Sequence, residues 1–587
     1  MPSETFPVIT RPRAALATLA AAVSALSLVP FTAAAHGSVR ASQAGSADSR
    51  PVYLVGGAAA SINPTRAMLA NKDFYLGGYG FGDDKIANKY QVPSTVGRYA
   101  TGILGDGVHS RALMVSDRHN TIAMAQIETQ GYFIEYKQGP FGLEDIRKDA
   151  SAQIYALALT EKHPAPVPSP RQILVDSDHT HSGPDTVGVW GGDPTSYLRE
   201  VHDRTVKALV DAWKAMRPAT LTYGVAHAGV ENETNEYPPS VNDDPLLTNQ
   251  FSNDARNQAM DDEIRVLQAR SVKTGKVIDT YVNYSSHPTV LGSDNTLVSG
   301  DYVGRLNLKI QKAFGGFGMD QVGTLGRTQP ARDGCTDPAK KGAAASLCAL
   351  DGYAKRVMVK VRYAVRHAKP VRGPATVGMS SYLIQDVSDS PILVGLEYTG
   401  SLIGVPGARA LGYPWFTATL LGTTTFSGHI GKVLVSGGPG EMYPQIVAEV
   451  RRDVPGMQGY MNIGTAGDFL GYLISPLSAY PEPIRRSMLS GNPPLNGDPS
   501  CGVAGLSVGC PDPIGNDNFF FNVSPSLGMR ITCSLLRGAA DTRGVPEQNY
   551  LLKDSTCHLF STDLLSAPGD DTKFAAPKDM SKQQPHM

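Results

Sequence analysis

The sequence predicts a mixed α/β fold, with one large domain over residues 52–490 and a cysteine-containing extension over 491–587. Three observations support this prediction. The 61 glycines and 42 prolines require much turn and loop, which argues against a long helical bundle. Short apolar runs rich in β-branched residues alternate with segments of helical periodicity. No long linker interrupts residues 52–490, so strands and helices belong to one continuous unit.

Charge and hydrophobicity exclude two classes of protein. The 587 residues carry 53 Lys and Arg against 54 Asp and Glu, a formal net charge of −1. A nucleic-acid-binding protein needs a basic surface that neutralises phosphates, and this balance offers none on average. With 41% hydrophobic and 18% charged residues the chain is also far from the composition of a disordered protein.

The first residues predict export. Two arginines precede an apolar run at 14–29, and the small residues 33–35 follow it. This pattern indicates a signal peptide over residues 1–35 that is cleaved near Ala35. The alternative is a membrane anchor, but the run is shorter than the ~20 residues needed to span a bilayer. We expect a secreted protein, extracellular or periplasmic, that begins with a flexible leader at 36–51.

Within the large domain, local patterns assign individual elements. Apolar runs four to eight residues long, rich in Val and Ile, indicate buried strands, whereas apolar residues at helical spacing indicate amphipathic helices. The expected strands are 121–125, 172–175, 277–284 and 432–435, and the expected helices are 143–159 and 197–213.

The cysteine count suggests a disulfide framework. Six cysteines in an exported chain favour three bridges, and the absence of a CxxC pair leaves a thiolate zinc site or redox motif unsupported. Proximity alone pairs neighbours, although six cysteines allow many other pairings. The pairs suggested by proximity are Cys335–Cys348, Cys501–Cys510 and Cys533–Cys557.

The most informative segment is a buried-looking strand at 173–178 that ends in His179-Thr180-His181. Histidines two residues apart on extended backbone point to the same face, and ligands collect beyond the carboxyl ends of strands. Imidazole is also a common zinc ligand. The Asp178 and Asp185 carboxylates are candidate acceptors for a ligand histidine. Two structural histidines held by hydrogen bonds are the alternative.

A second histidine has the same setting. The strand-like run at 277–284 ends in Ser285-Ser286-His287-Pro288. Taken alone, His287 is better explained as a buried structural residue. The repetition of a strand-terminal histidine suggests that both segments contribute to one site.

These segments resemble the neutral (alkaline, non-lysosomal) ceramidases. The resemblance rests on HTHSGP at 179–184, HP at 287–288 and LVSGDYVG at 297–304. It covers about residues 52–490. Further similar segments are 57–64, 76–80, 102–117, GPGE at 438–441 and 464–480.

The resemblance implies a large catalytic domain of mixed sheets and helices with one zinc ion per chain. In that family the metal is held by two His, one Glu and one Tyr, which match His179, His287, Glu441 and Tyr472 here. The implied reaction is hydrolysis of the amide bond of ceramide, or of a related N-acyl lipid, by zinc-activated water. His181 is placed to carry a proton or orient water, with a structural hydrogen bond as the alternative. The Tyr472 phenol is expected to leave the metal and donate to the developing oxyanion.

The sequence departs from the family in the loop at 324–331. The family carries a catalytic serine there, and Gln329 stands in its place, with Arg327 where the family has Asp. A carboxamide is no nucleophile, so we expect Gln329 or Arg327 to polarise the substrate instead. The nearby Cys335 and Cys348 resemble the family's loop disulfide, which supports this alignment.

Two further departures concern the substrate and the C-terminus. Glu236 stands where the family tends to have Arg at the substrate mouth, which reverses the local charge. Tyr480 lies in the segment that resembles the family's tyrosine-bearing run, and we expect it and Glu236 to contact substrate. The family's C-terminal immunoglobulin-like domain is not evident, because residues 500–560 show no series of alternating strands.

Other functions fit the same residues. One fold hosts many chemistries, so an esterase or another amidase on this scaffold is an alternative. A catalytically weakened homologue that binds a lipid is another, motivated by Gln329 and Glu236. No amphipathic anchor is evident in the sequence, so we expect at most peripheral contact with a membrane.

Overall fold

The computed structural model describes most of the large domain and one segment of the C-terminal extension, all within one compact unit that begins at Arg50. The expected signal peptide and three predicted site residues, Glu236, Arg327 and Tyr480, lie outside the described residues. The described residues are 50–79, 98–229 except 137 and 189, 246–249, 261–386 except 327 and 333, 421–473 except 455, and 527–543.

A nine-stranded sheet forms the first half of this unit. Its strand order is β11-β9-β8-β6-β1-β3-β4-β5, with β13 paired to β6. The pairs β4–β5 and β9–β11 are parallel and the other pairs are antiparallel. The expected strands at 121–125, 172–175 and 277–284 are confirmed as β4, β5 and β9. The nine strands are β1 (Tyr53–Ser61), β3 (His109–Ser116), β4 (Thr121–Ile127), β5 (Ile173–Ser177), β6 (Arg217–His227), β8 (Glu263–Ser271), β9 (Val277–Tyr284), β11 (Phe317–Val322) and β13 (Lys369–Pro370).

A second, four-stranded sheet packs against the inner face of the first. Leu174 and Tyr281 of the large sheet share one apolar core with Phe426 and Val435 of the small sheet. Burial of these faces drives the two sheets together. The strands of the second sheet, in spatial order, are β14 (Val377–Asp386), β15 (Leu421–Ile430), β16 (Val433–Gly437) and β18 (Gly459–Ile463).

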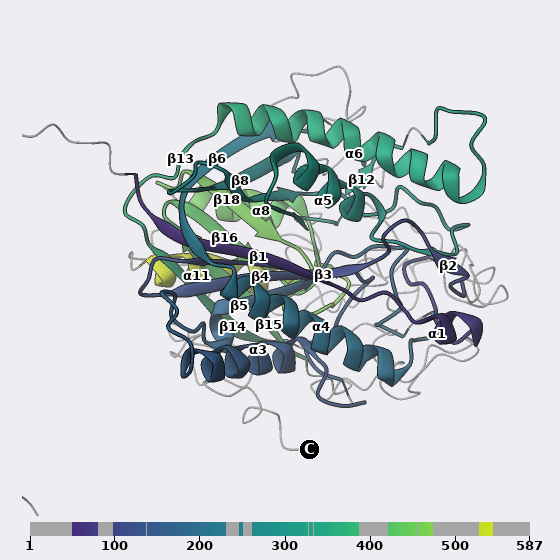
Figure 1. The fold of residues 1–587 in the computed structure, drawn as a ribbon, viewed down its shortest axis with the longest axis horizontal. Helices are drawn as coiled ribbons and strands as arrows, with labels where there is room; N and C mark the ends of the chain where they lie inside the picture. The colour runs from purple at the N-terminus through teal and green to yellow at the C-terminus, as the bar shows by residue number, and fades with distance from the viewer. Residues whose placement is uncertain are drawn as a thin grey trace, which may run out of the picture. The chain divides into compact units, whose positions relative to one another are not determined.

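Helices cover the outer face of each sheet. Helices α3 and α4 pack on the part of the large sheet around β1 and β3, and α5 and α6 on the part around β6 and β11. Figure 1 shows α6 well separated from the α3–α4 pair. Helices α8 and α11 cover the second sheet, which gives four layers, α/β/β/α. The six helices are α3 (Leu143–Ala158), α4 (Thr195–Lys214), α5 (Asp301–Phe314), α6 (Gly342–His367), α8 (Pro444–Asp453) and α11 (Leu527–Arg543).

Helix α11 differs from the expectation of a loop-rich C-terminal extension. Its residues Leu527, Ile531, Leu535 and Ala539 are fully buried and recur every four residues, so they form one apolar stripe. That stripe packs on the second sheet and α8. The flanking Gly-, Pro- and Asn-rich sequence hides this helical period. Among the described helices, none is long and apolar enough to cross a membrane.

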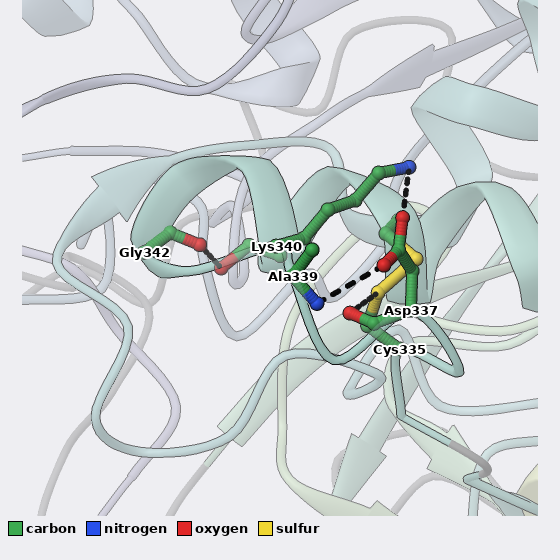
Figure 2. Close-up of a disulfide and its surroundings, with 7 residues drawn as sticks. Cys335, Asp337, Ala339, Lys340 and Gly342 are labelled. Carbon is green, nitrogen blue, oxygen red and sulfur yellow. Dashed lines mark hydrogen bonds and ion pairs between the residues drawn. A yellow bond between two sulfur atoms is a disulfide. The ribbon is translucent and has the colours of Figure 1, made fainter.

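The expected disulfide between Cys335 and Cys348 is present, with Cα atoms 5.2 Å apart. It joins the loop that follows Pro330 to α6, as Figure 2 shows. In the same loop, the Asp337 carboxylate accepts the Ala339 N–H at 3.0 Å. The other two expected pairs involve positions outside the described residues, although Cys533 in α11 is disulfide-bonded.

The carboxyl ends of β5, β9, β16 and β18 meet at one edge of the two sheets. Main-chain hydrogen bonds cross between the segments that follow these strands. Ser177 N–H at the end of β5 donates to the Thr465 carbonyl at 3.3 Å, and Thr465 N–H donates to the Gly440 carbonyl at 2.9 Å. The segment after each of these four strands contributes one of the predicted ligands.

Candidate metal centre

His179 follows β5 in a left-handed conformation, with a φ of 63°. Such a φ is uncommon for a residue with a side chain and tends to occur at functional sites. Its Nδ1 lies 2.7 Å from the Gln130 carbonyl oxygen, so the ring donates there. The ring also stacks on Phe469, with centroids 5.4 Å apart. These contacts fix the ring with Nε2 directed away from the main chain.

His287 is held in the same way after β9. Its Nδ1 donates to the Thr328 carbonyl oxygen at 2.6 Å, and its main-chain N–H donates to the same oxygen at 3.3 Å. His287 is 1% exposed. Both histidines therefore carry the hydrogen on Nδ1 and present an Nε2 lone pair to the site.

Glu441 and Tyr472 come from the second sheet. They are direct neighbours in a short parallel ladder formed by β17 (Glu441–Met442) and β19 (Tyr472–Leu473). Glu441 Oε2 lies 3.0 Å from His287 Nε2, and Oε1 lies 3.5 Å from His179 Nε2. The Tyr472 hydroxyl donates to the Glu441 carboxylate. The four predicted ligands are thus brought together from two sheets.

His181 joins this group. Its Nε2 lies 3.1 Å from His179 Nε2, and ligand atoms of His179, His181 and His287 all lie within 4.8 Å of one another. Its main-chain N–H donates to the Pro288 carbonyl at 3.2 Å, which ties the two histidine segments together. His181 Nδ1 has no hydrogen-bond partner among the described residues. Unlike His179 and His287, His181 is half-buried.

The protonation states suit a cation site. Burial lowers the pKa of His179 to about 4, so its imidazole is neutral near pH 7. Burial alone would raise the pKa of Glu441, but the imidazoles of His179 and His287 outweigh it and hold that pKa below its usual value. The centre therefore combines the neutral imidazole of His179 with one carboxylate.

This donor set fits a divalent metal. The Nε2 lone pairs of His179 and His287 and both oxygens of Glu441 are acceptors that face one another, and the Tyr472 hydroxyl donates only to the carboxylate. Such a buried group of acceptors repels itself unless a cation lies among them. Imidazole nitrogen and carboxylate oxygen are standard zinc ligands, and other divalent ions accept them too.

Comparison with known proteins supports the fold. The structure is similar to that of neutral ceramidase from Pseudomonas aeruginosa, with a TM-score of 0.53, 14% identity, and coverage of 86% of this chain and 76% of that one. A ceramidase complexed with C2 matches equally, at a TM-score of 0.53 and 14% identity over 85% and 76%. The fold is neutral-ceramidase-like. No family model and no curated protein sequence matches the chain.

One expectation for the site is wrong. Asp178 and Asp185 do not accept hydrogen bonds from the ligand histidines, because main-chain carbonyls already fill that role. The Asp178 carboxylate instead accepts the Thr180 N–H at 3.1 Å. Asp185 organises the following turn by accepting main-chain N–H groups, at distances from 2.7 to 2.9 Å. Those donors are Gly188, Trp190 and Gly192.

Gln329 lies beside the centre on β12 (Thr328–Pro330), next to the carbonyl that orients His287. Its Oε1 accepts a hydrogen bond from the Thr289 hydroxyl at 2.5 Å. Gln329 is half-buried. The Gln329 carboxamide is therefore held close to His287 by a defined contact.

Several residues that shape the site were missed by the sequence analysis. Gln130 supplies a main-chain carbonyl, which any residue type can do, so its side chain gives no signal. Phe469 stacks on His179, which lies 290 positions earlier in the chain. Tyr79 packs edge-on against His181 with ring centroids 4.7 Å apart, and Arg98 Nη2 donates to the His181 carbonyl at 2.8 Å. Contacts of such long range leave no local pattern.

Proposed function

We propose that this chain is a secreted zinc-dependent amidohydrolase that cleaves the N-acyl amide bond of ceramide or a related N-acyl lipid. The observation that carries the proposal is the group of inward-facing acceptors at the carboxyl ends of four strands in a neutral-ceramidase-like fold. The predicted signal peptide at 1–35 and the Cys335–Cys348 disulfide support secretion.

In this proposal His179, His287, Glu441 and Tyr472 hold one zinc ion per chain. When bound, the ion supplies Lewis acidity toward the acyl carbonyl and activates water. Glu441 offsets part of the metal's charge. The Tyr472 hydroxyl, which donates to Glu441, is available to stabilise negative charge that develops on the acyl oxygen.

His181 is the proposed proton carrier. Its ring lies against His179, and its buried Nδ1 has no hydrogen-bond partner among the described residues. It accepts the proton that water loses as the new C–O bond forms. It then gives that proton to the nitrogen as the C–N bond breaks, so that the products are a fatty acid and a free amine.

Gln329 replaces the nucleophilic serine as a positioning and polarising group. Since the Thr289 hydroxyl donates to Oε1, the amide N–H groups of Gln329 are left to donate to the acyl carbonyl. Arg327, Glu236 and Tyr480 are assigned to the substrate site by sequence resemblance alone. Because Gln329 provides no nucleophile, an esterase that acts on a more reactive bond is the second candidate.

The experiment compares a fluorogenic short-chain ceramide with a matched acyl ester, using the zinc-loaded secreted chain. We expect amide cleavage that stops with a chelator and returns with zinc. The variant His181→Gln should lower kcat about 100-fold, as expected for loss of a general acid–base group. The variant His119→Gln, at an exposed turn, is the matched control. Cleavage of the ester without the amide would favour the second candidate, and cleavage of neither would refute the proposal.

A further inference from the structure

The outer side of α6 carries a run of positive charge without any acid. Residues 352–373 contain seven Lys and Arg and no Asp or Glu, although the whole chain is nearly neutral. Helix α6 is the longest of the described helices and runs along one margin of the unit in Figure 1. Its inner side is buried against the large sheet and α5. The exposed cations of this segment are Lys355, Arg362, Arg366, Lys369 and Arg372.

Three of these cations share one face of the helix with two apolar side chains. The spacing of these five residues is three or four positions, which places them on the same side of a helix. Val359 is 56% exposed and Tyr363 is 45% exposed, so their apolar surface lies in solvent among the charges. We call this face the α6 stripe. It consists of Lys355, Val359, Arg362, Tyr363 and Arg366.

The cations of the α6 stripe lack the partners that would neutralise them. None of the three forms an ion pair among the described residues. Asp351, the acid that precedes the stripe, is already paired with two cations of α5, Arg305 at 2.9 Å and Lys309 at 3.1 Å. The α6 stripe therefore presents positive charge to solvent.

The outer face of α4 shows a different pattern, typical of a helix face that only meets water. There Arg204 pairs with Glu200 at 2.7 Å, and Lys207 pairs with Asp211 four residues on. Opposite charges at this spacing stabilise a helix, whereas like charges destabilise it. The α6 stripe instead has Arg362 four residues before Arg366. Helix stability therefore does not account for the charges of the α6 stripe.

We propose that the α6 stripe docks the protein on the surface of an anionic lipid bilayer. Its unpaired cations complement the negative charge of such a surface, to which each nearby Lys or Arg adds attraction. The inference goes beyond the proposed hydrolysis and does not depend on it, because it concerns binding alone.

The apolar residues of the stripe favour lipid over a nucleic acid as the partner. Val359 has no group that binds a phosphate, but it is able to enter the boundary between head groups and acyl chains. Tyr363 suits the same depth, since its ring is apolar and its hydroxyl is polar. His367 already lies against the Tyr363 ring, with centroids 4.0 Å apart, which leaves less of that ring for stacking on a base.

The test is co-sedimentation of the zinc-loaded full chain with vesicles of phosphatidylcholine, either alone or mixed equally with phosphatidylglycerol. At low salt we expect about 100-fold stronger partitioning onto the anionic vesicles, since each of three cations contributes about fivefold. High salt should remove this preference, because exposed charges are screened. The combined variant Lys355→Gln, Arg362→Gln, Arg366→Gln should bind the two kinds of vesicle nearly equally.

A second variant tests the apolar part of the stripe. The combined variant Val359→Ser, Tyr363→Ser keeps every charge and should lower partitioning onto the anionic vesicles about tenfold. Unchanged partitioning in this variant would contradict insertion into the lipid and overturn the inference.

The matched control removes three exposed cations from α4, which changes the net charge of the protein by the same amount. It combines Arg204→Gln, Lys207→Gln and Lys214→Gln, and it should keep the preference for anionic vesicles. Thermal unfolding of all variants checks that they are folded.

The other outcomes would overturn the inference. These are equal partitioning of the wild type onto both kinds of vesicle, a preference that survives loss of the α6 cations, and a preference that is lost equally in the α4 control. Capture by single-stranded DNA but not by anionic vesicles would identify a different polyanion and would also overturn it. None of these results bears on the proposed hydrolysis, which a soluble short-chain substrate reports.

Discussion

The two buried histidines each donate their Nδ1 hydrogen to a main-chain carbonyl, His179 to Gln130 and His287 to Thr328. A carbonyl does not titrate. It therefore fixes the histidine tautomer without the change of charge that a carboxylate can undergo with pH. The Nε2 lone pairs are then available at any pH at which the rings are neutral. Among the described residues, the only carboxylate in contact with both rings is that of Glu441, which is left to balance the metal's charge.

Asp279 provides a test at the scale of one residue. It is 1% exposed, and neither carboxylate oxygen has a hydrogen-bond partner among the described residues. Burial raises its pKa well above the usual value of 3.8. In the folded protein it therefore keeps its proton to a higher pH than in the unfolded chain, and the free energy of unfolding falls as pH rises above about 4.

The variant Asp279→Asn should consequently stabilise the protein at pH 8, by about 2 kcal/mol, and flatten the decline of stability between pH 5 and about pH 8. Thermal unfolding across this pH range is the measurement. Asp294→Asn, at an exposed position, is the control and should change neither quantity. A loss of stability in Asp279→Asn at pH 8 would contradict this account of the buried carboxyl.

Single residues of the site were predictable to different degrees. His179, His181 and His287 follow apolar strands, so their positions at a strand end can be read locally. Glu441 and Tyr472 carry no such signal and were reached only through the family resemblance. Arg98 and Tyr79 were missed, because their contacts with His181 join positions about 100 residues apart.

At the scale of elements, two strands of only two residues each position two of the proposed metal ligands. The parallel ladder of β17 and β19 pairs Glu441 directly with Tyr472. Gly440 precedes it, and a Cβ at this position would lie 2.4 Å from the Gly471 carbonyl oxygen. The absence of a side chain at Gly440 is therefore what lets the two segments approach.

The variant Gly440→Ala should separate these segments and move Glu441 away from the histidines. We expect a loss of about 2 kcal/mol in the free energy of unfolding and weaker zinc binding. Gly352→Ala is the matched control, because a Cβ on this glycine of α6 meets nothing within 4 Å. Zinc titration and thermal unfolding of both variants are the measurements. Native zinc affinity in Gly440→Ala would show that the close approach is not needed.

Long elements were predicted well and short ones were not. The strands β4, β5 and β9 and the helices α3 and α4 have clear apolar periods, which determine their faces within the core. Strands β17 and β19 are too short for any period. They exist because the surrounding segments hold their main chains side by side.

Across the whole described unit, the centre joins two sheets that come from distant parts of the sequence. The large sheet contributes the histidines and the second sheet contributes Glu441 and Tyr472. Local sequence patterns could not predict the order of the four layers, because that order depends on which apolar faces pack together. Helix α11 illustrates this point, because only its packing against the second sheet shows that it belongs to the core.

The central claim is that these residues from both sheets hold one metal ion. The most direct measurement is the zinc content of the purified chain by mass spectrometry, for the wild type and for His179→Ala, His287→Ala and the surface control His119→Ala. We predict about one zinc per chain in the wild type and the control, and almost none in the two site variants. A full zinc complement in both site variants, or a zinc-free wild type after supplementation, would contradict the account.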